Sequence, residues 1–208
     1  MTYSELRAYA SDKCRKNSGT LAVITLIYTV FISSGNVSFE SDSKWFLLGL
    51  LLSLIYILIY GPIYYGYMHV IKKNCDEQTV EVNDLFKGFS RYGFSFVLVL
   101  LQGIYILLWS LLFVIPGIIK SCAYSMAHYI ALENPELSAN ECITRSKEMM
   151  DGHKWDYFCL RLSYIGWYIL SALTLGILSF WVMPKVETAS YLFYKSIKKT
   201  NEVTEIEY

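Results

Sequence analysis

The sequence predicts an all-α fold, a polytopic transmembrane helical bundle formed by a single domain over residues 1–208. Hydrophobic residues make up 54% of the chain and charged residues only 17%. Four long stretches contain no Asp, Glu, Lys or Arg: 17–39, 45–71, 92–119 and 162–184. A helix of about 20 mostly apolar residues crosses the hydrocarbon core of a bilayer, so each stretch is long enough to span it. A soluble bundle is the alternative, but these stretches exceed the usual length of a buried core helix.

Six spans are expected, because turns divide two of the apolar regions. Pro116 and Gly117 end one helix and start the next, since proline lacks a backbone donor and disfavours helical geometry in the residue before it. Thr174-Leu175-Gly176 provides a second turn. The predicted spans are 18–34, 45–71, 92–115, 118–132, 157–173 and 178–196, and they form three successive helical hairpins.

The distribution of cations favours six crossings over the alternative of four. Six crossings place residues 1–17, 72–91, 133–156 and 195–208 on one side, together with 14 of the 18 Lys and Arg residues. Four crossings move 133–156 to the other side and leave 11 there. Cytoplasmic segments of membrane proteins are enriched in Lys and Arg, so we expect six crossings with both termini in the cytoplasm.

Short helices are expected on the cytoplasmic side. Apolar positions recur every three or four residues in 1–17, which predicts an amphipathic interfacial helix there. "VNDLFKGFSRYGF" indicates a second interfacial piece. Ser138 and Glu141 have the spacing of a capping box, which predicts a surface helix over 138–151.

The candidate functional residues are polar groups inside or beside the spans, because ionisable residues in a membrane segment mark functional sites by default. We expect Glu187 and Lys185 at the outer interface, with Glu187 paired to Lys120 or water, and Arg161 near the inner face. The candidate polar positions are Lys120, His128, Arg161, Lys185 and Glu187; the candidate turn or kink positions are Pro62, Pro116, Gly117 and Pro184.

The sequence contains none of the common catalytic or cofactor motifs that we considered. GxxxxGK, HExxH and GxSxG are absent, and the three histidines have no ligand-like spacing. The five cysteines form no CxxC pair and are expected to be reduced thiols. We therefore expect no enzyme activity, no cofactor and no metal site, and the net charge of zero gives no indication of a nucleic-acid partner.

The region from 108 to 194 carries a family pattern. Its motifs are Leu108-Trp109, Ile115-Pro116-Gly117-Ile118, Tyr124-Ser125-Met126, Glu133-Asn134-Pro135, Gly152-His153-Lys154, Ile165-Gly166-Trp167 and Phe193-Tyr194. The chain resembles the domain-of-unknown-function family numbered 975, the predicted integral membrane proteins of Gram-positive bacteria. Lys185 stands where that pattern leads us to expect an aromatic residue. The resemblance implies a multi-span bacterial membrane protein and transfers no catalytic residue.

The leading functional hypothesis is a non-enzymatic integral protein of the bacterial cytoplasmic membrane. We expect it to bind membrane lipids or a membrane protein partner, or to form a homo-oligomer, in a scaffold, envelope-stress or immunity-type role. A small-molecule or peptide transporter component is the alternative, and an intramembrane enzyme is third. A transporter predicts a polar cavity lined by groups such as His128 or Glu187.

Overall fold

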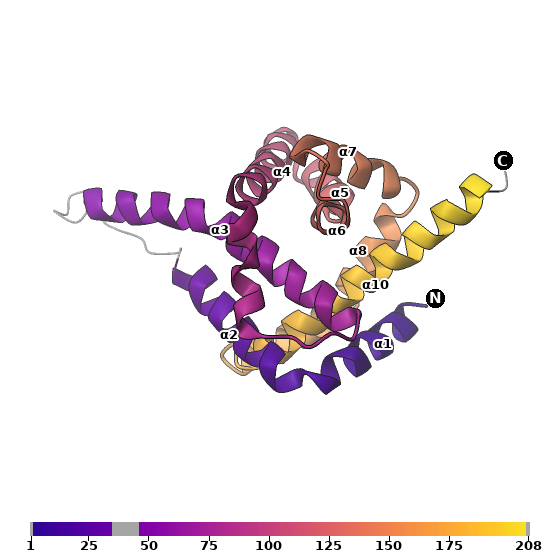
Figure 1. Cartoon of the computed structure of the whole chain (residues 1–208), viewed down its shortest axis with the longest axis horizontal. Helices are drawn as coiled ribbons and strands as arrows, with labels where there is room; N and C mark the ends of the chain where they lie inside the picture. The colour runs from indigo at the N-terminus through magenta and orange to yellow at the C-terminus, as the bar shows by residue number, and fades with distance from the viewer. Residues whose placement is uncertain (1, 35–45, 207–208) are drawn as a thin grey trace.

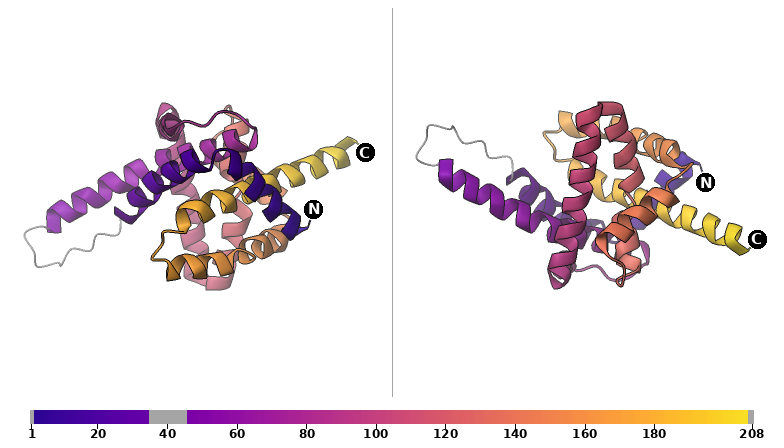
Figure 2. Two further views of the ribbon diagram at one scale, coloured as in Figure 1. Left: turned by 90° about the horizontal axis from the view of Figure 1, so that it is seen from below. Right: turned by 90° about the horizontal axis from the view of Figure 1, so that it is seen from above.

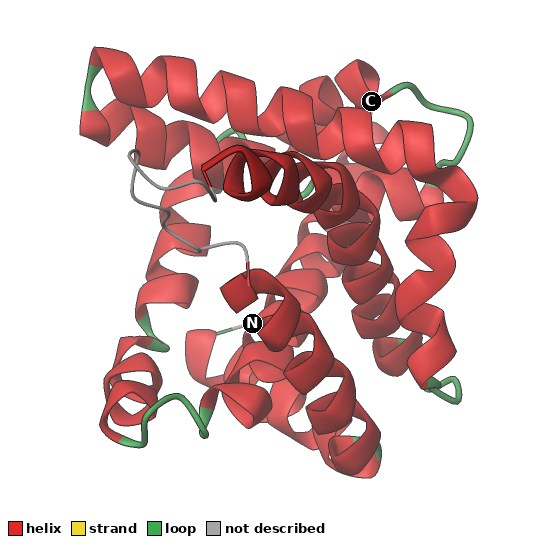
Figure 3. Cartoon of the chain, turned by 90° about the vertical axis from the view of Figure 1, so that its left-hand side faces the viewer, coloured by secondary structure: helices red, strands yellow, loops and turns green. Residues whose placement is uncertain are grey.

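The computed structural model describes residues 2–34 and 46–206, and every regular element in these ranges is helical (Figure 3). The predicted all-helical fold is therefore confirmed for the described chain. The elements are α1 (Tyr3–Lys16), α2 (Ser18–Ser34), α3 (Phe46–Cys75), the 3-10 helix η1 (Val82–Arg91), α4 (Tyr92–Leu112), α5 (Val114–Tyr124), α6 (Ala127–Glu133), α7 (Ala139–Met149), α8 (Lys154–Leu162), α9 (Ile165–Leu173) and α10 (Ser179–Ile206). Residue 45, where the second predicted span starts, lies outside the described residues.

The short helices outside the spans form as the sequence predicts. A capping box between Thr2 and Glu5 starts α1, and Leu6, Ala10 and Cys14 make its buried face. These positions are spaced by four residues, so one stripe of the helix packs against the bundle. The box between Ser138 and Glu141 starts α7, which lies within the predicted range 138–151.

The chain turns between α4 and α5, but it does so at Phe113 instead of Pro116-Gly117. Phe113 has extended backbone angles, φ −161° and ψ 147°, and separates two helices that pack side by side (Figure 1). Pro116 lies in the first turn of α5, where backbone N–H groups have no partner inside the helix and a proline costs nothing. A Cβ on Gly117 would lie 2.2 Å from Ser110 Oγ, so this glycine permits close packing of the two helices.

Two of the predicted spans are interrupted. The range 118–132 is split between α5 and α6, and the range 157–173 between α8 and α9. The range 178–196 falls within α10, which continues to Ile206. In the described chain, two stretches are long and apolar enough to cross a membrane, Gly49–Cys75 and Val82–Leu111, so six spans are not supported.

The helix η1 packs directly on the backbone of α3. A Cβ on Gly66 would lie 1.8 Å from the carbonyl oxygen of Leu85, and a Cβ on Gly88 would lie 1.9 Å from that of Pro62. Glycine is required at both positions because no side chain fits between the two backbones. Pro62 itself is inside α3, as Pro184 is inside α10.

Four polar segments that are distant in sequence contact one another, and we call these contacts the polar network. Its direct contacts join α1, the end of α3 with η1, residues 132–135 at the end of α6 together with Asp156 of α8, and the second half of α10. They are Tyr3 to Asp156 (3.0 Å), Lys13 to Glu77, Lys72 to the Leu132 carbonyl (3.3 Å), Arg91 to the Pro135 carbonyl (2.5 Å), Lys195 to Asp76 (2.5 Å) and Lys198 to Glu133 (2.7 Å). The segments expected on one side of the membrane are thus neighbours in space.

Candidate functional site

An ion pair between α8 and α10 is the centre of the candidate site. Arg161 Nη1 donates to Glu187 Oε1 at 2.9 Å, and the two side chains are 41% and 20% exposed. The Tyr129 hydroxyl lies 3.4 Å from the same carboxylate and 3.3 Å from the Glu187 carbonyl. Glu187 is therefore paired with Arg161, and the expected pairing with Lys120 is wrong.

The turn between α9 and α10 lies within the predicted turn Thr174-Leu175-Gly176, and it sets where Glu187 packs. Leu175 and Gly176 have positive φ values of 53° and 85°, which reverse the chain within a few residues. Glycine adopts this left-handed conformation readily. Since α10 starts at Ser179, its residue Glu187 returns alongside α8 and meets Arg161.

A polar cavity of about 330 Å³ opens beside the ion pair. Its polar lining comes from α3, α4, α5 and α8 together with the residue that follows α5, and consists of Tyr64, Gln102, Ser121, Tyr157 and Ser125 in addition to the pair. The Gln102 amide donates to the Tyr124 carbonyl at 2.9 Å, and both serines donate to carbonyls of their own segments. The hydroxyl hydrogens of both serines are engaged, so the serine oxygens and Gln102 Oε1 remain as acceptors for a bound polar group.

An apolar groove of about 410 Å³ between α5 and α8 adjoins this cavity. Ile118, Cys122 and Phe158 line both, so the cavity and the groove are adjacent and share these side chains. The groove adds Ile115, Ile119 and Trp155, with Lys154 as its charged member. A charged polar cavity thus lies next to an apolar groove.

His128 lies behind the cavity wall. Its side chain is 3% exposed, and its ring meets the Tyr64 ring edge-on with 4.6 Å between centroids. Neither ring nitrogen has a hydrogen-bond partner among the described residues. His128 does not line the cavity, although Tyr64, which does, is in direct contact with it.

Lys120 and Lys185 are held by aromatic rings. The Lys120 ammonium lies 4.5 Å from the ring centre of Trp109, and that of Lys185 lies 5.9 Å from Trp167. Such cation–π contacts let a long cationic side chain stay beside an apolar surface. Of the five polar positions that the sequence nominates, the structure brings together Arg161 and Glu187.

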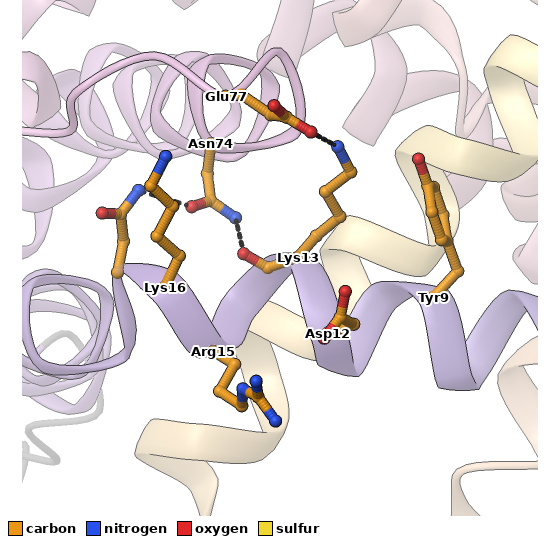
Figure 4. A pocket seen from close by; sticks show the side chains of 8 residues that line it. Tyr9, Asp12, Lys13, Arg15, Lys16, Asn74 and Glu77 are labelled. Carbon is orange, nitrogen blue, oxygen red and sulfur yellow. Dashed lines mark hydrogen bonds and ion pairs between the residues drawn. The ribbon is translucent and has the colours of Figure 1, made fainter.

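A separate cavity of about 460 Å³ lies where α1 meets the end of α3 (Figure 4). Asn74 donates to the Lys13 carbonyl at 3.3 Å and accepts from Asn17 at 3.0 Å, while Lys13 pairs with Glu77. Their mutual hydrogen bond raises the pKa of Lys13 and lowers the pKa of Glu77. Since these groups satisfy one another, the arrangement fixes α1 to α3.

The described residues contain no group of three His, Cys, Asp or Glu side chains placed to hold a metal ion. All five cysteines are free thiols, and all but Cys159 are buried.

Sequence reasoning missed most of the cavity lining. Tyr64 and Tyr157 are two of 18 tyrosines, and nothing in their spacing distinguishes them. Gln102 could have been chosen as a candidate from sequence, because it is the one side-chain amide in the uncharged stretch 92–119. The apolar groove depends on how α5 packs beside α8, which local sequence does not encode.

Comparison with known proteins gives one match. The model of the family described as "Protein of unknown function (DUF975)" matches residues 111–201. No curated protein and no solved structure shows a significant match to the chain. The matched region overlaps the motifs between 108 and 194 and includes α5 to α9, most of α10, and both residues of the Arg161–Glu187 pair. The resemblance predicted from those motifs is confirmed over residues 111–201, the part of the chain that matches the DUF975 family model.

Proposed function

We propose that this chain is a non-enzymatic integral protein of a bacterial cytoplasmic membrane that binds a zwitterionic lipid or a similar amphiphile between α5 and α8. The observation that carries the proposal is that the charged cavity and the apolar groove are adjacent and share the side chains of Ile118, Cys122 and Phe158. A lipid has the same two-part character, a polar headgroup joined to an acyl chain.

The outward-facing apolar surface supports a membrane location. In the most apolar windows of Gly49–Cys75 and Val82–Leu111, 33% and 11% of the residues are buried, whereas a core helix of a soluble protein is mostly buried. Exposed apolar side chains on α3 include Leu47, Leu50, Leu51, Leu54 and Ile57. Soluble monomers rarely expose continuous apolar patches of this extent.

The polar network supports a common side for the four polar segments. Segments that bind one another directly cannot be separated by a bilayer, so the chain crosses the membrane an even number of times between them. Because these segments hold 14 of the 18 Lys and Arg residues, we place them and both termini in the cytoplasm.

The charges of the site favour a zwitterionic headgroup. An anionic group is attracted by Arg161 but repelled by Glu187, and a cationic group is attracted by Glu187 but repelled by Arg161. A headgroup that carries both charges, such as phosphoethanolamine, satisfies both residues at once. Its acyl chain would lie along Ile118, Ile119 and Phe158 in the groove.

Lipid binding can be tested with protein purified in mild detergent. Native mass spectrometry should show retained phosphatidylethanolamine, and added phosphatidylethanolamine should raise the melting temperature more than phosphatidylglycerol does. Arg161→Ala, at the polar end, and Ile118→Trp, which fills the groove, should each lose both effects. Arg145→Ala is the matched control, because Arg145 is an exposed cation on α7, away from the site. Equal lipid retention by all variants would refute the proposal.

A transporter component is the second candidate, because the cavity contains the Glu187 carboxylate and its lining residue Tyr64 contacts the His128 ring. Neither nitrogen of that ring has a hydrogen-bond partner among the described residues. In proteoliposomes this candidate predicts substrate flux that Glu187→Gln abolishes. A protein partner or a homo-oligomer would instead copurify through exposed charges of α7. Replacing Arg145 and Lys147 together should then release the partner without affecting bound lipid.

A further inference from the structure

We infer that the hairpin formed by α9 and the start of α10 is re-entrant: it enters the hydrocarbon from the side of α1, ends among the acyl chains of that leaflet, and returns to the same side. The inference rests on the membrane location proposed above. It replaces two of the predicted crossings, 157–173 and 178–196, by one half-inserted loop.

Both ends of this hairpin are fixed to α1. Arg7 Nη1 donates to the carbonyl of Ser163 at 2.9 Å, just before α9. On the returning helix α10, the Thr188 hydroxyl lies 3.3 Å from the Cys14 thiol, and this contact is buried. Figures 1 and 2 show α1 beside α10, with the turn that follows α9 pointing away from both termini.

Helix α1 is restricted to the aqueous interface by its charges. It has six charged side chains, which occur from its first turn to its last: Glu5, Arg7, Asp12, Lys13, Arg15 and Lys16. Such a helix lies at the level of the headgroups, with its buried stripe facing the protein. The anchor points Ser163 and Thr188 are therefore close to that level as well.

The hairpin is too short to reach the far side from these anchors. Ser163 precedes the tip residue Leu175 by 12 positions, and Thr188 follows it by 13. At about 1.5 Å per helical residue these distances are at most roughly 18 and 20 Å. The hydrocarbon core is about 30 Å thick, so the tip cannot reach its far side. The 30 residues of α3 and the 21 of α4 meet that thickness.

The surface of the tip fits hydrocarbon. Leu173, Leu175 and Ile177 are 76%, 92% and 61% exposed, and no other part of the described chain covers them. No charged residue occurs between Arg161 and Lys185. The partner of this surface is therefore the acyl-chain region of a leaflet.

The turn also satisfies its own backbone, as a chain in hydrocarbon must. Every backbone N–H from Thr174 to Ser179 has an acceptor within the turn or the helix before it. The bonds include Gly176 to the Ser171 carbonyl at 2.8 Å and Leu178 to the Thr174 hydroxyl at 3.4 Å. The hydroxyls of Ser171 and Ser179 bond each other at 2.6 Å. A turn in water would need no such complete internal pairing, because water supplies partners.

The test places a spin label at Leu175→Cys in protein reconstituted into vesicles. We expect collision with dissolved oxygen and loss of collision with a water-soluble nickel chelate. Arg145→Cys on α7 is the aqueous control, and Ile57→Cys on the exposed face of α3 is the membrane control. The parent protein gives the background, since its thiols are buried apart from the half-buried Cys159.

Membrane-impermeant maleimide applied to intact cells and to inverted vesicles completes the test. Leu175→Cys should react from neither side. Reaction from outside intact cells would show a full crossing, and nickel collision equal to that of Arg145→Cys would show a tip in water; either result overturns the inference. Extraction of the whole protein by carbonate without detergent would instead refute the membrane location on which it rests.

Discussion

Substitution of Gly66 by alanine tests the direct backbone contact between α3 and η1. The added Cβ would lie 1.8 Å from the Leu85 carbonyl oxygen, about half the distance of an ordinary contact. The Cβ is fixed by the backbone of α3 and the oxygen belongs to the backbone of η1, so no rotamer change can separate them. Overpacking of this kind costs about 3 kcal/mol, while Gly→Ala in a helix gains about 1 kcal/mol. The net loss of about 2 kcal/mol should lower the melting temperature by about 4–8 °C for a chain of this size.

The control is a second helical glycine with open space around it. Gly103 in α4 has no atom within 4 Å of the position of an added Cβ, so Gly103→Ala should leave the melting temperature unchanged or raise it. Both variants can be compared in one detergent by intrinsic fluorescence during heating. Equal melting temperatures for Gly66→Ala and Gly103→Ala would show that η1 does not pack on α3 in this way.

Three further predictions concern polar contacts. Arg161→Ala and Glu187→Gln should each lower the melting temperature, and the double variant should lose less than their sum, with a coupling of about 1 kcal/mol in a double-mutant cycle. Burial raises the pKa of Glu133, but hydrogen bonds from Lys198 and a tyrosine outweigh it and hold that pKa below its ordinary value of 4.5. The resulting stability is present above pH 4.5 and lost as the pH falls below it, so Glu133→Gln should flatten this acid limb of the melting-temperature profile; an unchanged limb would contradict the assignment. Asn74→Ala should weaken the junction of α1 with α3 by about 1–3 kcal/mol and speed proteolysis within α1, and cleavage at the wild-type rate would argue against that junction.

The sequence predicted the secondary structure well where local signals act. The apolar periodicity of residues 1–17 predicted the first helix, and the capping box at Ser138 predicted α7, each close to its observed bounds. These features depend on residues within one or two turns of one another. Their information is therefore present in any short window of sequence.

Long-range packing explains the errors. The sequence predicts the turn at Pro116-Gly117, but the turn lies at Phe113, and Gly117 permits the close contact with Ser110. The chain reverses at Leu175 and Gly176, within the turn that the sequence predicts. The partner of Glu187 is not predicted correctly, because the packing of α10 beside α8 brings it to Arg161. A charged residue's distant partner does not follow from periodicity.

The contacts of α1 have a consequence for biosynthesis. Tyr3 and Arg7 bind partners that are 153 and 156 positions further along the chain. These partners leave the ribosome only after most of the protein has been made, so α1 completes its docking late, after its junction with α3 at Asn74 and Glu77 can form. Until α10 is made, the buried stripe of Leu6, Ala10 and Cys14 lacks the Thr188 contact that closes it.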